Sequence, residues 1–417
     1  MLDLKIIREE TEKVKIGLLK RMPADKLNLE LIVSLDDDRR LLINRVEALK
    51  NQRNQNSKIK PSSEVIIAMK KIGEEIKEIE KKLNEKEIKL NELLAELPNI
   101  PSDDVVAGDK ENNQVIYTYG KKPEFNFIPK NHVDLATSLN LIDYERAAKM
   151  SGSGFWCYTG VGALLEWALL SYFKDFHVKN SYKFLILPFL LTEESAYTSG
   201  HLPKFRDDLF WTQDKLCLNA TAEMMLGNYH RDEILNLEQP LKYFSYAPSF
   251  RREAGSYRQE ERGMIRGHQF NKIEMFIFCK PEETWDMFEE LTENAKKLVE
   301  GLGLHFQLSK LAAGDCSAAM AKTYDVEVFI PSMEIYKEVS SISNALDYQA
   351  RRGQIRYRNN KTNKNEFAHS LNASGLATSR ILPAILEQNQ QADGSVIIPE
   401  VLRPYMPNNM AVIKINN

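Results

Sequence analysis

The chain of 417 residues lacks long apolar runs, and this absence excludes membrane-spanning helices. No stretch approaches the roughly 20 consecutive apolar residues that a membrane-spanning helix needs. The first residues, MLDLKIIREE, are charged from the start and contain no apolar signal core. Charged residues make up 28% of the chain, and its mean hydropathy is −0.41. We therefore expect a cytoplasmic protein with no membrane partner.

Cysteine and histidine are sparse and scattered. The four cysteines are Cys157, Cys217, Cys279 and Cys316, and no two of them have the spacing of a CxxC metal pair. Each lies among apolar or small residues, which predicts reduced thiols in the core. The seven histidines include no HxxxH pair, so a structural zinc site is not expected.

An excess of positive charge is also missing. The formal net charge is −3, which argues against a DNA-binding protein and limits any contact with RNA to local basic patches. Two common phosphate-binding signatures are absent from the sequence, since no GxGxxG follows an expected strand and there is no P-loop. Nucleotide-binding folds of the Rossmann and Walker types are therefore excluded.

The first 100 residues predict helices separated by turns. A short helix is expected before Pro23 and a long helix from Leu29 onward. The sequence Lys60-Pro61-Ser62-Ser63 breaks the pattern, and Ser62 or Ser63 can cap the helix that follows. Pro98 and Pro101 end that second long helix.

The second long helix carries a heptad pattern with one polar interruption at Lys86. Two such helices joined by a short turn predict an antiparallel coiled-coil hairpin with arms of roughly 45–50 Å. The expected seam consists of Val65, Met69, Ile72, Ile76, Ile79, Leu83, Lys86, Leu90, Leu93 and Leu97.

Basic residues concentrate toward the expected tip of this hairpin. They are Arg39, Arg40, Arg45, Lys50, Arg53, Lys58, Lys60, Lys70 and Lys71. Such charges can neutralise phosphates without reading a base sequence. Taken by itself, the pattern fits a spacer or dimerisation element slightly better than an RNA-binding arm.

The remainder of the chain mixes strands and helices without a βαβ rhythm. Residues 101–122 are polar and rich in turn residues, and we expect them to link residues 1–100 to a second domain at 123–417. Within that domain, GALLEWALLSYFKDF predicts an amphipathic helix, and KFLILPFLL predicts a buried strand broken by Pro188.

The most informative stretch is Phe250–Phe276, FRREAGSYRQEERGMIRGHQFNKIEMF, which predicts a long hairpin carrying many charges. The ordinary alternative is a solvated hairpin with surface ion pairs. Here the arginines, among them Arg258 and Arg262, alternate with glycine and aromatic residues. Guanidinium groups beside the Phe270 ring suit a nucleotide, because they bind phosphates while the ring stacks on a base.

This stretch resembles motif 2 of the class II aminoacyl-tRNA synthetases, in the spelling of the seryl-tRNA synthetase family: FRxEAGS followed by RG-x-IR-x-HQF-x-K-x-E. The helix and strand after residue 160 resemble motif 1, and HSLNASGLATSR resembles motif 3. The resemblance covers nearly the whole chain. It implies an α+β protein, with an N-terminal antiparallel coiled-coil hairpin followed by a class II antiparallel β-sheet domain flanked by helices.

The resemblance also implies a function. The enzyme would activate L-serine with ATP and transfer the serine to tRNA(Ser), with tRNA(Sec) as a further candidate acceptor. It would be a homodimer. Residues 1–100 would then be a tRNA-binding arm, because the family uses this hairpin to hold the long variable arm of tRNA.

Roles in ATP binding follow from the matched motifs. Arg251 would bridge the serine carboxylate and the α-phosphate, and it would be catalytic together with Arg380 of motif 3. Phe270 and Arg380 would hold the two faces of adenine, while Glu338 and Ser341 supply hard oxygen donors for Mg²⁺. The implied ATP-binding set is Arg251, Arg252, Glu253, Arg266, Gly267, Phe270, Glu338, Val339, Ser340, Ser341 and Arg380.

Serine needs a small polar pocket. The family's TxE corresponds to Thr221-Ala222-Glu223, which would hold the ammonium end, and Glu274 would take the hydroxyl. A site that binds the hydroxyl can reject analogues that lack it. The implied serine-binding set is Thr221, Ala222, Glu223, Arg251, Glu274, Asn372 and Ser374.

The sequence departs from the family at several positions. Arg252, Ala373 and Ser379 stand where smaller residues are usual, and the loop Tyr257–Glu261 is bulkier and carries two acids. These departures keep a catalytically impaired, RNA-binding or regulatory paralogue as an alternative. A ligase that charges a carrier protein is a second alternative, although such relatives lack the arm.

Overall fold

The computed structural model describes residues 1–58, 62–253 and 263–415. Lys60 and Pro61 of the expected turn lie outside the described residues, as do Arg258, Arg262 and the loop Tyr257–Glu261. The chain divides into two compact units, Met1–Ile100 and Pro101–Asn417.

The first unit is helical. Its elements are α1 (Leu4–Glu9), α2 (Thr11–Leu19), the 3-10 turn η1 (Ala24–Lys26), α3 (Leu29–Asn56) and α4 (Ser63–Glu96). The single short helix expected before Pro23 is two helices, because the backbone leaves the helical region at Glu10 (φ −126°, ψ 38°). The expected cap of the second long helix is confirmed, since the Ser62 side chain accepts a hydrogen bond from the Val65 N–H.

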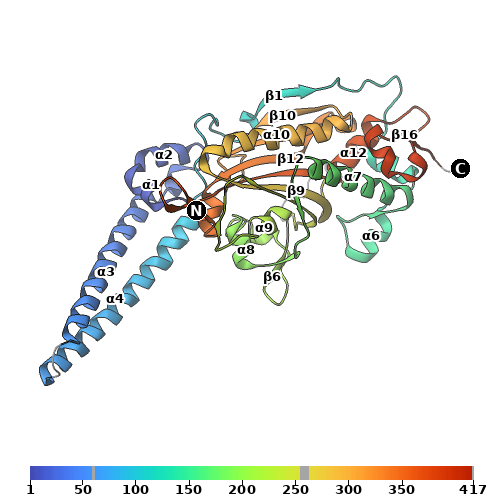
Figure 1. The fold of residues 1–417 in the computed structure, drawn as a ribbon. Helices are drawn as coiled ribbons and strands as arrows, with labels where there is room; N and C mark the ends of the chain where they lie inside the picture. Colours follow the sequence, from blue (N-terminus) through green and yellow to red (C-terminus); the bar gives the residue numbers. More distant parts are fainter. Residues whose placement is uncertain (59–61, 254–262, 416–417) are drawn as a thin grey trace. The chain divides into compact units, whose positions relative to one another are not determined.

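Helices α3 and α4 form the predicted antiparallel coiled coil (Figure 1). Every residue of the predicted seam in α4 is buried or half-buried. The polar interruption at Lys86 is matched across the hairpin, because its Nζ lies 2.6 Å from Asp38 Oδ2 on α3. With 28 and 34 residues the two helices are about 42 and 51 Å long.

Part of the basic set of the hairpin is engaged within it. Arg45 and Lys50 pair with Glu75 and Glu80 of α4, at 2.7 and 2.8 Å. Other members of the set are exposed, namely Arg40, Arg53, Lys58, Lys70 and Lys71.

The second unit is built on an eight-stranded sheet, counted over the described residues, in the order β1-β10-β11-β12-β15-β9-β8-β4. Neighbouring strands are antiparallel except β4 and β8, which run parallel. In this order the strands are Gln114–Tyr119, Phe306–Lys310, Lys322–Ile330, Ile335–Leu346, His369–Ala377, Gln269–Cys279, Leu241–Phe250 and Lys183–Leu185. The predicted α+β class, with an antiparallel sheet flanked by helices, is confirmed.

Residues 101–122, expected to be a linker, contain a strand of this sheet. Strand β1 pairs with β10 at the sheet edge, and Asp104 holds Lys310 and Lys322 at 2.7 and 2.8 Å. Turn residues dominate the composition of the segment, so its sequence alone does not reveal the strand.

The two faces of the sheet are covered differently. One face carries the large core, to which α5 (His132–Ser138), α7 (Gly160–Lys179), α10 (Thr284–Gly301) and α12 (Thr378–Gln388) contribute. The other face carries a smaller core with α8 (Glu193–Thr198), α9 (Ala222–Leu226) and the pair β5–β6 (Leu190–Thr192, Leu216–Leu218). Figure 1 shows α8 and α9 on the opposite side of the sheet from α10.

Shorter elements complete the unit. They are α6 (Tyr144–Ser151), α11 (Tyr348–Arg352), β2 (Ile142–Asp143), β3 (Cys157–Tyr158), β7 (Ile234–Leu235), β13 (Arg356–Asn359), β14 (Lys364–Phe367), β16 (Val396–Ile397) and β17 (Val412–Ile413).

The prediction for the segment around Pro188 is confirmed only in part. The segment KFLILPFLL was predicted to be a buried strand broken by Pro188. The break is confirmed, because β4 and β5 lie on either side of Pro188, but the predicted burial was wrong: both strands are short and largely exposed, and Ile186 between them is 77% exposed. Strand β4 is an edge strand, so only one neighbour covers it. The four cysteines are free thiols as predicted, with Cys157 half-buried and the others buried. None of the described helices is both long and apolar enough to cross a membrane.

Candidate active site

The predicted hairpin Phe250–Phe276 is confirmed in its described part and forms one wall of the site. Strands β8 and β9 pair in antiparallel register, with Ser249 opposite Phe270. Because side chains alternate along a strand, Phe270, Lys272 and Glu274 point to one face of the sheet, and the residues between them point to the other. A cavity of about 420 Å³ lies on the Lys272 side, continuous with a narrower one of about 50 Å³ that Phe270 lines.

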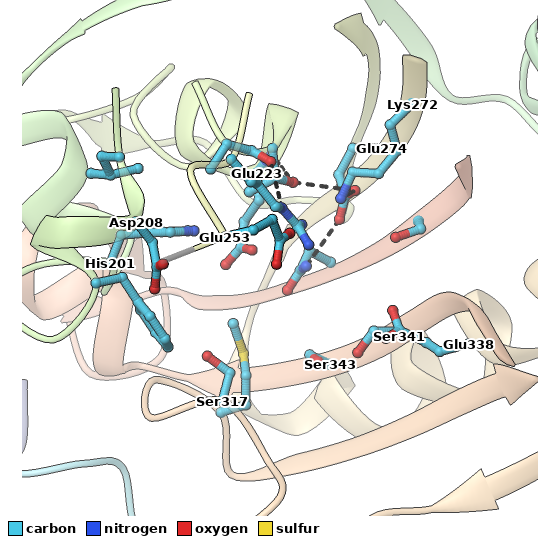
Figure 2. Close-up of a pocket in the computed structure, with 18 of the residues that line it drawn as sticks. His201, Asp208, Glu223, Glu253, Lys272, Glu274, Ser317, Glu338, Ser341 and Ser343 are labelled. Atoms are coloured by element: carbon cyan, nitrogen blue, oxygen red, sulfur yellow. Dashed lines mark hydrogen bonds and ion pairs between the residues drawn. The ribbon is translucent and has the colours of Figure 1, made fainter. Parts of the chain in front are cut away.

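One end of the cavity is a buried charged cluster. Lys272 Nζ lies 2.6 Å from Glu274 Oε2, and the Glu274 side chain is only 1% exposed. Asn372 Nδ2 donates to Glu274 Oε1 at 3.0 Å, and the Thr221 hydroxyl lies 3.5 Å from Oε2. Figure 2 shows Lys272 and Glu274 together at this end of the cavity. Each oxygen of the carboxylate therefore has a partner, and the group is held rigidly.

A second buried carboxylate, Glu223, stands beside this cluster. Its Oε1 accepts a hydrogen bond from Gln349 Nε2 at 2.7 Å. Burial, with repulsion from Glu274, raises the pKa of Glu223 to about 7, although the charge of Lys272 and the Gln349 hydrogen bond oppose the shift. Thr221 caps α9 by accepting from the Glu223 N–H, which fixes the start of this short helix.

Arg251 joins the two cavities. It follows β8 directly, and its Nε donates to the Ala220 carbonyl at 3.2 Å. Its guanidinium lies 5.2 Å from the centre of the Phe270 ring. The Arg251 backbone is clamped by His268, whose carbonyl accepts from the Arg251 N–H at 2.9 Å. The guanidinium is thus oriented by contacts on both sides and lines both cavities.

Two further arginines pair with carboxylates along the cavities. Arg266 Nε donates to Glu253 Oε2 at 2.6 Å. Arg380, near the start of α12, donates through Nη1 to the Glu338 carbonyl at 2.7 Å and contacts Glu338 Oε2 at 3.3 Å. Burial would raise the pKa of Glu338, but the positive charges of Arg380, Arg251 and Lys272 outweigh it and lower the pKa. Glu338 therefore stays ionised.

The narrower cavity, called the slot below, is lined by residues of β9, β12 and the start of α12. Phe270, Val339 and Arg380 line it together with Gly267. A Cβ at Gly267 would lie 2.2 Å from the Trp156 ring, so the position requires glycine for close packing.

The structure brings most of the predicted site residues together. Those lining one or both cavities are Thr221, Glu223, Arg251, Glu253, Arg266, Gly267, Phe270, Glu274, Glu338, Val339, Ser341, Asn372, Ser374 and Arg380.

Three predicted residues do not line either cavity. Arg252 is exposed, and its backbone N–H donates to the Asp208 carbonyl at 2.9 Å. Ala222 is buried at the start of α9. Ser340 is buried and donates to the Ser374 carbonyl at 2.6 Å, so it supports the wall from behind.

Several residues of the site had no predicted role. Lys272 is the partner of Glu274, and the two-residue spacing on a strand is the signal that could have placed both on one face. Gln349 holds Glu223 from α11, and no sequence pattern points to it. His201 and Ser317 from loops, and Asp208 from the short 3-10 helix η3 (Arg206–Asp208), also line the cavity (Figure 2), and such segments follow no periodicity that a sequence pattern reveals.

Two of the departures from the family pattern are accommodated. Ala373 points into the large core rather than the cavity, so its methyl group is packed. Ser379 is buried and lines the narrower cavity, where it narrows the slot without removing a charged group.

The donor groups fit a hard cation only together with a ligand. Among the described residues no three His, Cys, Asp or Glu side chains gather as a metal site. Glu338 and Ser341 offer two oxygen donors on one wall of the cavity, and Figure 2 shows them side by side.

The antiparallel sheet, with arginines and carboxylates on one face and helices on the other, is the catalytic core of a class II aminoacyl-tRNA synthetase. The family model for the tRNA synthetase class II core domain (G, H, P, S and T) matches residues 205–389. The model for the seryl-tRNA synthetase N-terminal domain matches residues 1–101.

Individual relatives narrow the assignment. The chain is 53% identical to serine–tRNA ligase 2 of Clostridium acetobutylicum, over 97% of this chain and 99% of the relative. A crystal structure of seryl-tRNA synthetase from Pyrococcus horikoshii complexed with ATP superposes with a TM-score of 0.94 at 32% identity, over 100% of both chains. The cytoplasmic serine–tRNA ligase of Naegleria fowleri in complex with AMP gives a TM-score of 0.89 at 29% identity, over 100% of this chain and 99% of that one. The chain belongs to the seryl-tRNA synthetase family.

Proposed function

We propose that this chain activates L-serine with ATP, forming seryl-adenylate and pyrophosphate, and then transfers the serine to tRNA(Ser). The observation that carries the proposal is the buried cluster around Lys272, Glu274 and Glu223 at one end of an arginine-lined cavity. A small polar substrate with a cationic end fits such a cluster, and a polyanion fits the arginines.

Serine would lie with its two ends on different groups. The Glu223 carboxylate receives the ammonium group, and the serine carboxylate points to Arg251. Glu274 accepts a hydrogen bond from the side-chain hydroxyl. Because Glu274 is rigidly held and almost fully buried, a substrate without the hydroxyl leaves a buried oxygen with one bond fewer. This arrangement disfavours alanine and glycine.

ATP would lie along the arginines. Phe270 and Arg380 hold the adenine faces, Glu253 contacts the base edge, and Arg266 contacts the γ-phosphate. The slot of about 50 Å³ between the two adenine contacts supports this placement. Arg251, which lines both cavities, lies where the serine carboxylate and the α-phosphate meet.

The first step joins two anions. A serine carboxylate oxygen forms a bond to the α-phosphorus, and the bond from that phosphorus to the bridging oxygen breaks, so pyrophosphate leaves. In the second step a terminal ribose hydroxyl of the tRNA attacks the serine carbonyl, and AMP leaves. Positioning and neutralisation of charge are the main demands of the first step, and the site needs no acid–base triad for it.

Mg²⁺ fits this site as a partner of the ATP phosphates. Glu338 and Ser341 would provide two of its oxygen ligands, beside the phosphate oxygens of ATP. When bound, the ion neutralises phosphate charge. The lowered pKa of Glu338 supports this role, because an ionised carboxylate is needed.

The coiled-coil hairpin would hold tRNA. Its exposed basic residues, Arg53, Lys58, Lys70 and Lys71, lie near the ends of α3 and α4 that meet at the turn. They can neutralise backbone phosphates of the variable arm. Serine, ATP and tRNA are all available in the cytoplasm, and we infer that the enzyme acts there.

A homodimer is supported by an apolar surface on α7 and β4. Trp167 and Leu164 of α7 are 63% and 43% exposed, and Ile186 follows the exposed edge strand β4. A second copy of the chain would cover these side chains and the free edge of β4.

The test is serine-dependent exchange between ATP and pyrophosphate, without tRNA, against a panel of amino acids that includes alanine, threonine and glycine. Exchange with serine only, followed by charging of tRNA(Ser), is the expected result. Parallel assays with tRNA(Sec) show whether that acceptor is used as well. If the folded protein catalyses ATP–pyrophosphate exchange with none of the amino acids, the result would instead support an RNA-binding paralogue.

A further inference from the structure

Glu166 is a buried carboxyl group that the reaction does not use directly. It lies on α7, on the face of the sheet opposite the cavity, and is 3% exposed. Its Oε1 accepts from Asn271 Nδ2 at 2.8 Å and from the Thr378 hydroxyl at 2.6 Å. The Thr378 hydroxyl also contacts the Asn271 carbonyl at 3.2 Å. One carboxyl oxygen thus ties α7 to both β9 and α12.

These contacts fall beside the residues expected to hold adenine. Asn271 lies between Phe270 and Lys272 on β9, so its side chain points to the helix face while theirs point to the cavities. Thr378 is the first residue of α12 and precedes Arg380 by two positions. The segments that carry Phe270 and Arg380 are therefore both fastened to the same oxygen.

The second oxygen of Glu166 has a different environment. Within the described part of the chain, Glu166 Oε2 and the Tyr158 hydroxyl are both buried without a hydrogen-bond partner. The negative charge of Glu166 adds to burial in raising the pKa of Tyr158, which shows that the two groups are close. A hydrogen bond between Oε2 and the tyrosine oxygen would satisfy both atoms.

Burial is also the largest influence on Glu166 itself. It raises the pKa of Glu166 to about 7, although hydrogen bonds from Thr378 and Asn271 oppose the shift. The titratable groups that face Glu166 are Tyr158 from β3 and Tyr246 from β8. The Tyr246 hydroxyl donates to Asn271 Oδ1 at 3.0 Å. Neither tyrosine is charged at neutral pH.

We propose that Glu166 is a positioning residue for ATP, and that its carboxyl group holds β9 and α12 at the separation that Phe270 and Arg380 need to enclose the base. This inference rests on the proposed function, because it assumes that the slot between Phe270 and Arg380 receives adenine. Glu166 contacts no substrate. It acts from the back of the sheet through Asn271 and Thr378.

Three variants separate the parts of this proposal. Glu166→Leu removes the hydrogen bonds from both Asn271 and Thr378. Thr378→Val removes only the bond from Thr378 and keeps the side-chain shape. Glu166→Gln keeps an acceptor at Oε1 and replaces Oε2 with an NH₂ group.

Glu387 provides a matched control on the same helix. It is fully buried near the C-terminal end of α12, and its carboxylate accepts from the His132 and Ser332 backbone N–H groups, each at 2.8 Å. Glu387→Leu therefore removes a comparable set of buried hydrogen bonds at a place that is not next to Arg380. It shows how the loss of a buried carboxyl group affects the Tm and the ATP Kd when the group has no role in positioning ATP.

The measurements are the Kd for ATP by calorimetry without serine, the KM for serine at saturating ATP, and the Tm. We expect Glu166→Leu to raise the ATP Kd about tenfold, because both hydrogen bonds to Oε1 are lost, and Thr378→Val to raise it about threefold, because one of them is lost. The KM for serine should stay within about twofold of wild type, because uniform loss of ATP binding leaves the serine subsite unchanged. Glu387→Leu should lower the Tm and leave the ATP Kd unchanged.

The Glu166→Gln variant tests whether the acceptor at Oε1 is the group that matters. Its side-chain oxygen can still accept from Asn271 and Thr378, so its ATP Kd should stay within about twofold of wild type.

Two results would overturn the proposal. One is an unchanged ATP Kd in Glu166→Leu and Thr378→Val with a lowered Tm, which is the behaviour of a structural residue. The other is an ATP Kd for Glu166→Gln that rises about tenfold, which would show that the acceptor at Oε1 is not what positions β9 and α12. If Glu166→Leu does not fold, Thr378→Val and Glu166→Gln still decide. Wild-type protein that binds ATP but exchanges with no amino acid would count against the proposed function rather than against this inference.

Discussion

The contact between Gln349 and Glu223 predicts a pH-dependent defect in serine binding when Gln349 is replaced by leucine. Gln349 is 2% exposed, and its Nε2 donates to Glu223 Oε1 at 2.7 Å. Its own Oε1 accepts from the Ser370 hydroxyl at 2.7 Å. The amide is therefore oriented from behind and presents its donor to Glu223. Leucine keeps the bulk and removes the donor.

The size of the effect follows from the pKa of Glu223. Burial raises this pKa to about 7 while Gln349 lowers it. A hydrogen bond to a charged group contributes roughly 1.5–3 kcal/mol, and one pKa unit corresponds to about 1.4 kcal/mol. Losing the bond should raise the pKa of Glu223 by about 1–2 units. At pH 7 the ionised share would then fall from about one half to roughly 1–10%.

Serine binding follows the ionised share, because the ammonium group needs a carboxylate. We expect the KM for serine to rise roughly 5- to 50-fold at pH 7, with the KM for ATP unchanged. The sign is fixed by the raised pKa: the carboxylate is recovered as the pH rises, so the defect should shrink toward alkaline pH.

The assay is ATP–pyrophosphate exchange at saturating ATP over a range of pH. The ratio of variant to wild-type KM at each pH cancels the titration of serine itself. Ser370→Ala is the control, because it removes a hydrogen bond of Gln349 without touching Glu223, and its ratio should not change with pH. A ratio for Gln349→Leu that is the same at every pH would refute the reasoning.

Four further predictions concern other parts of the chain. Arg251→Ala should lower exchange activity by roughly 10²–10³-fold or more, because two anions lose their shared guanidinium; circular dichroism checks the fold. Glu274→Ala should raise the KM for serine and relax discrimination against alanine in the exchange assay, and it should destabilise the enzyme by about 3–5 kcal/mol, because the buried Lys272 loses its partner. Ile76→Ala should cost the hairpin about 2–5 kcal/mol in chemical denaturation, because Ile76 is buried in the seam. The double variant Lys58→Glu with Lys70→Glu should leave exchange unchanged and raise the KM for tRNA in aminoacylation.

Each of these predictions can fail in a defined way. Near-normal exchange by the Arg251 variant would remove it from the reaction centre, and an unchanged serine-to-alanine ratio would move the hydroxyl contact away from Glu274. If the Ile76→Ala variant unfolds at the same denaturant concentration as the wild-type protein, Ile76 does not stabilise the hairpin. A wild-type KM for tRNA in the charge-reversed double variant would place the RNA contact elsewhere.

The sequence was most informative where local periodicity and composition decide the structure. The coiled-coil hairpin follows from a heptad pattern and a capping serine, and both are local properties of residues 62–97. The free cysteines and the β8–β9 hairpin were predictable for the same reason. Predictions failed where a neighbour in space decides. Strand β4 has an apolar sequence but lies at a sheet edge, so it is exposed.

The same distinction between local sequence and neighbours in space applies to the candidate site. The sequence by itself determined which charged residues the chain carries and in what order. The resemblance of its motifs to those of a known family was enough to single out Arg251, Glu274, Glu338 and Arg380. Tertiary structure alone decided what surrounds them. Gln349 reaches Glu223 across 126 positions of sequence, and Glu166 reaches Thr378 across 212. The pKa of a buried carboxyl depends on burial and on such partners, and both arise only when distant segments pack together.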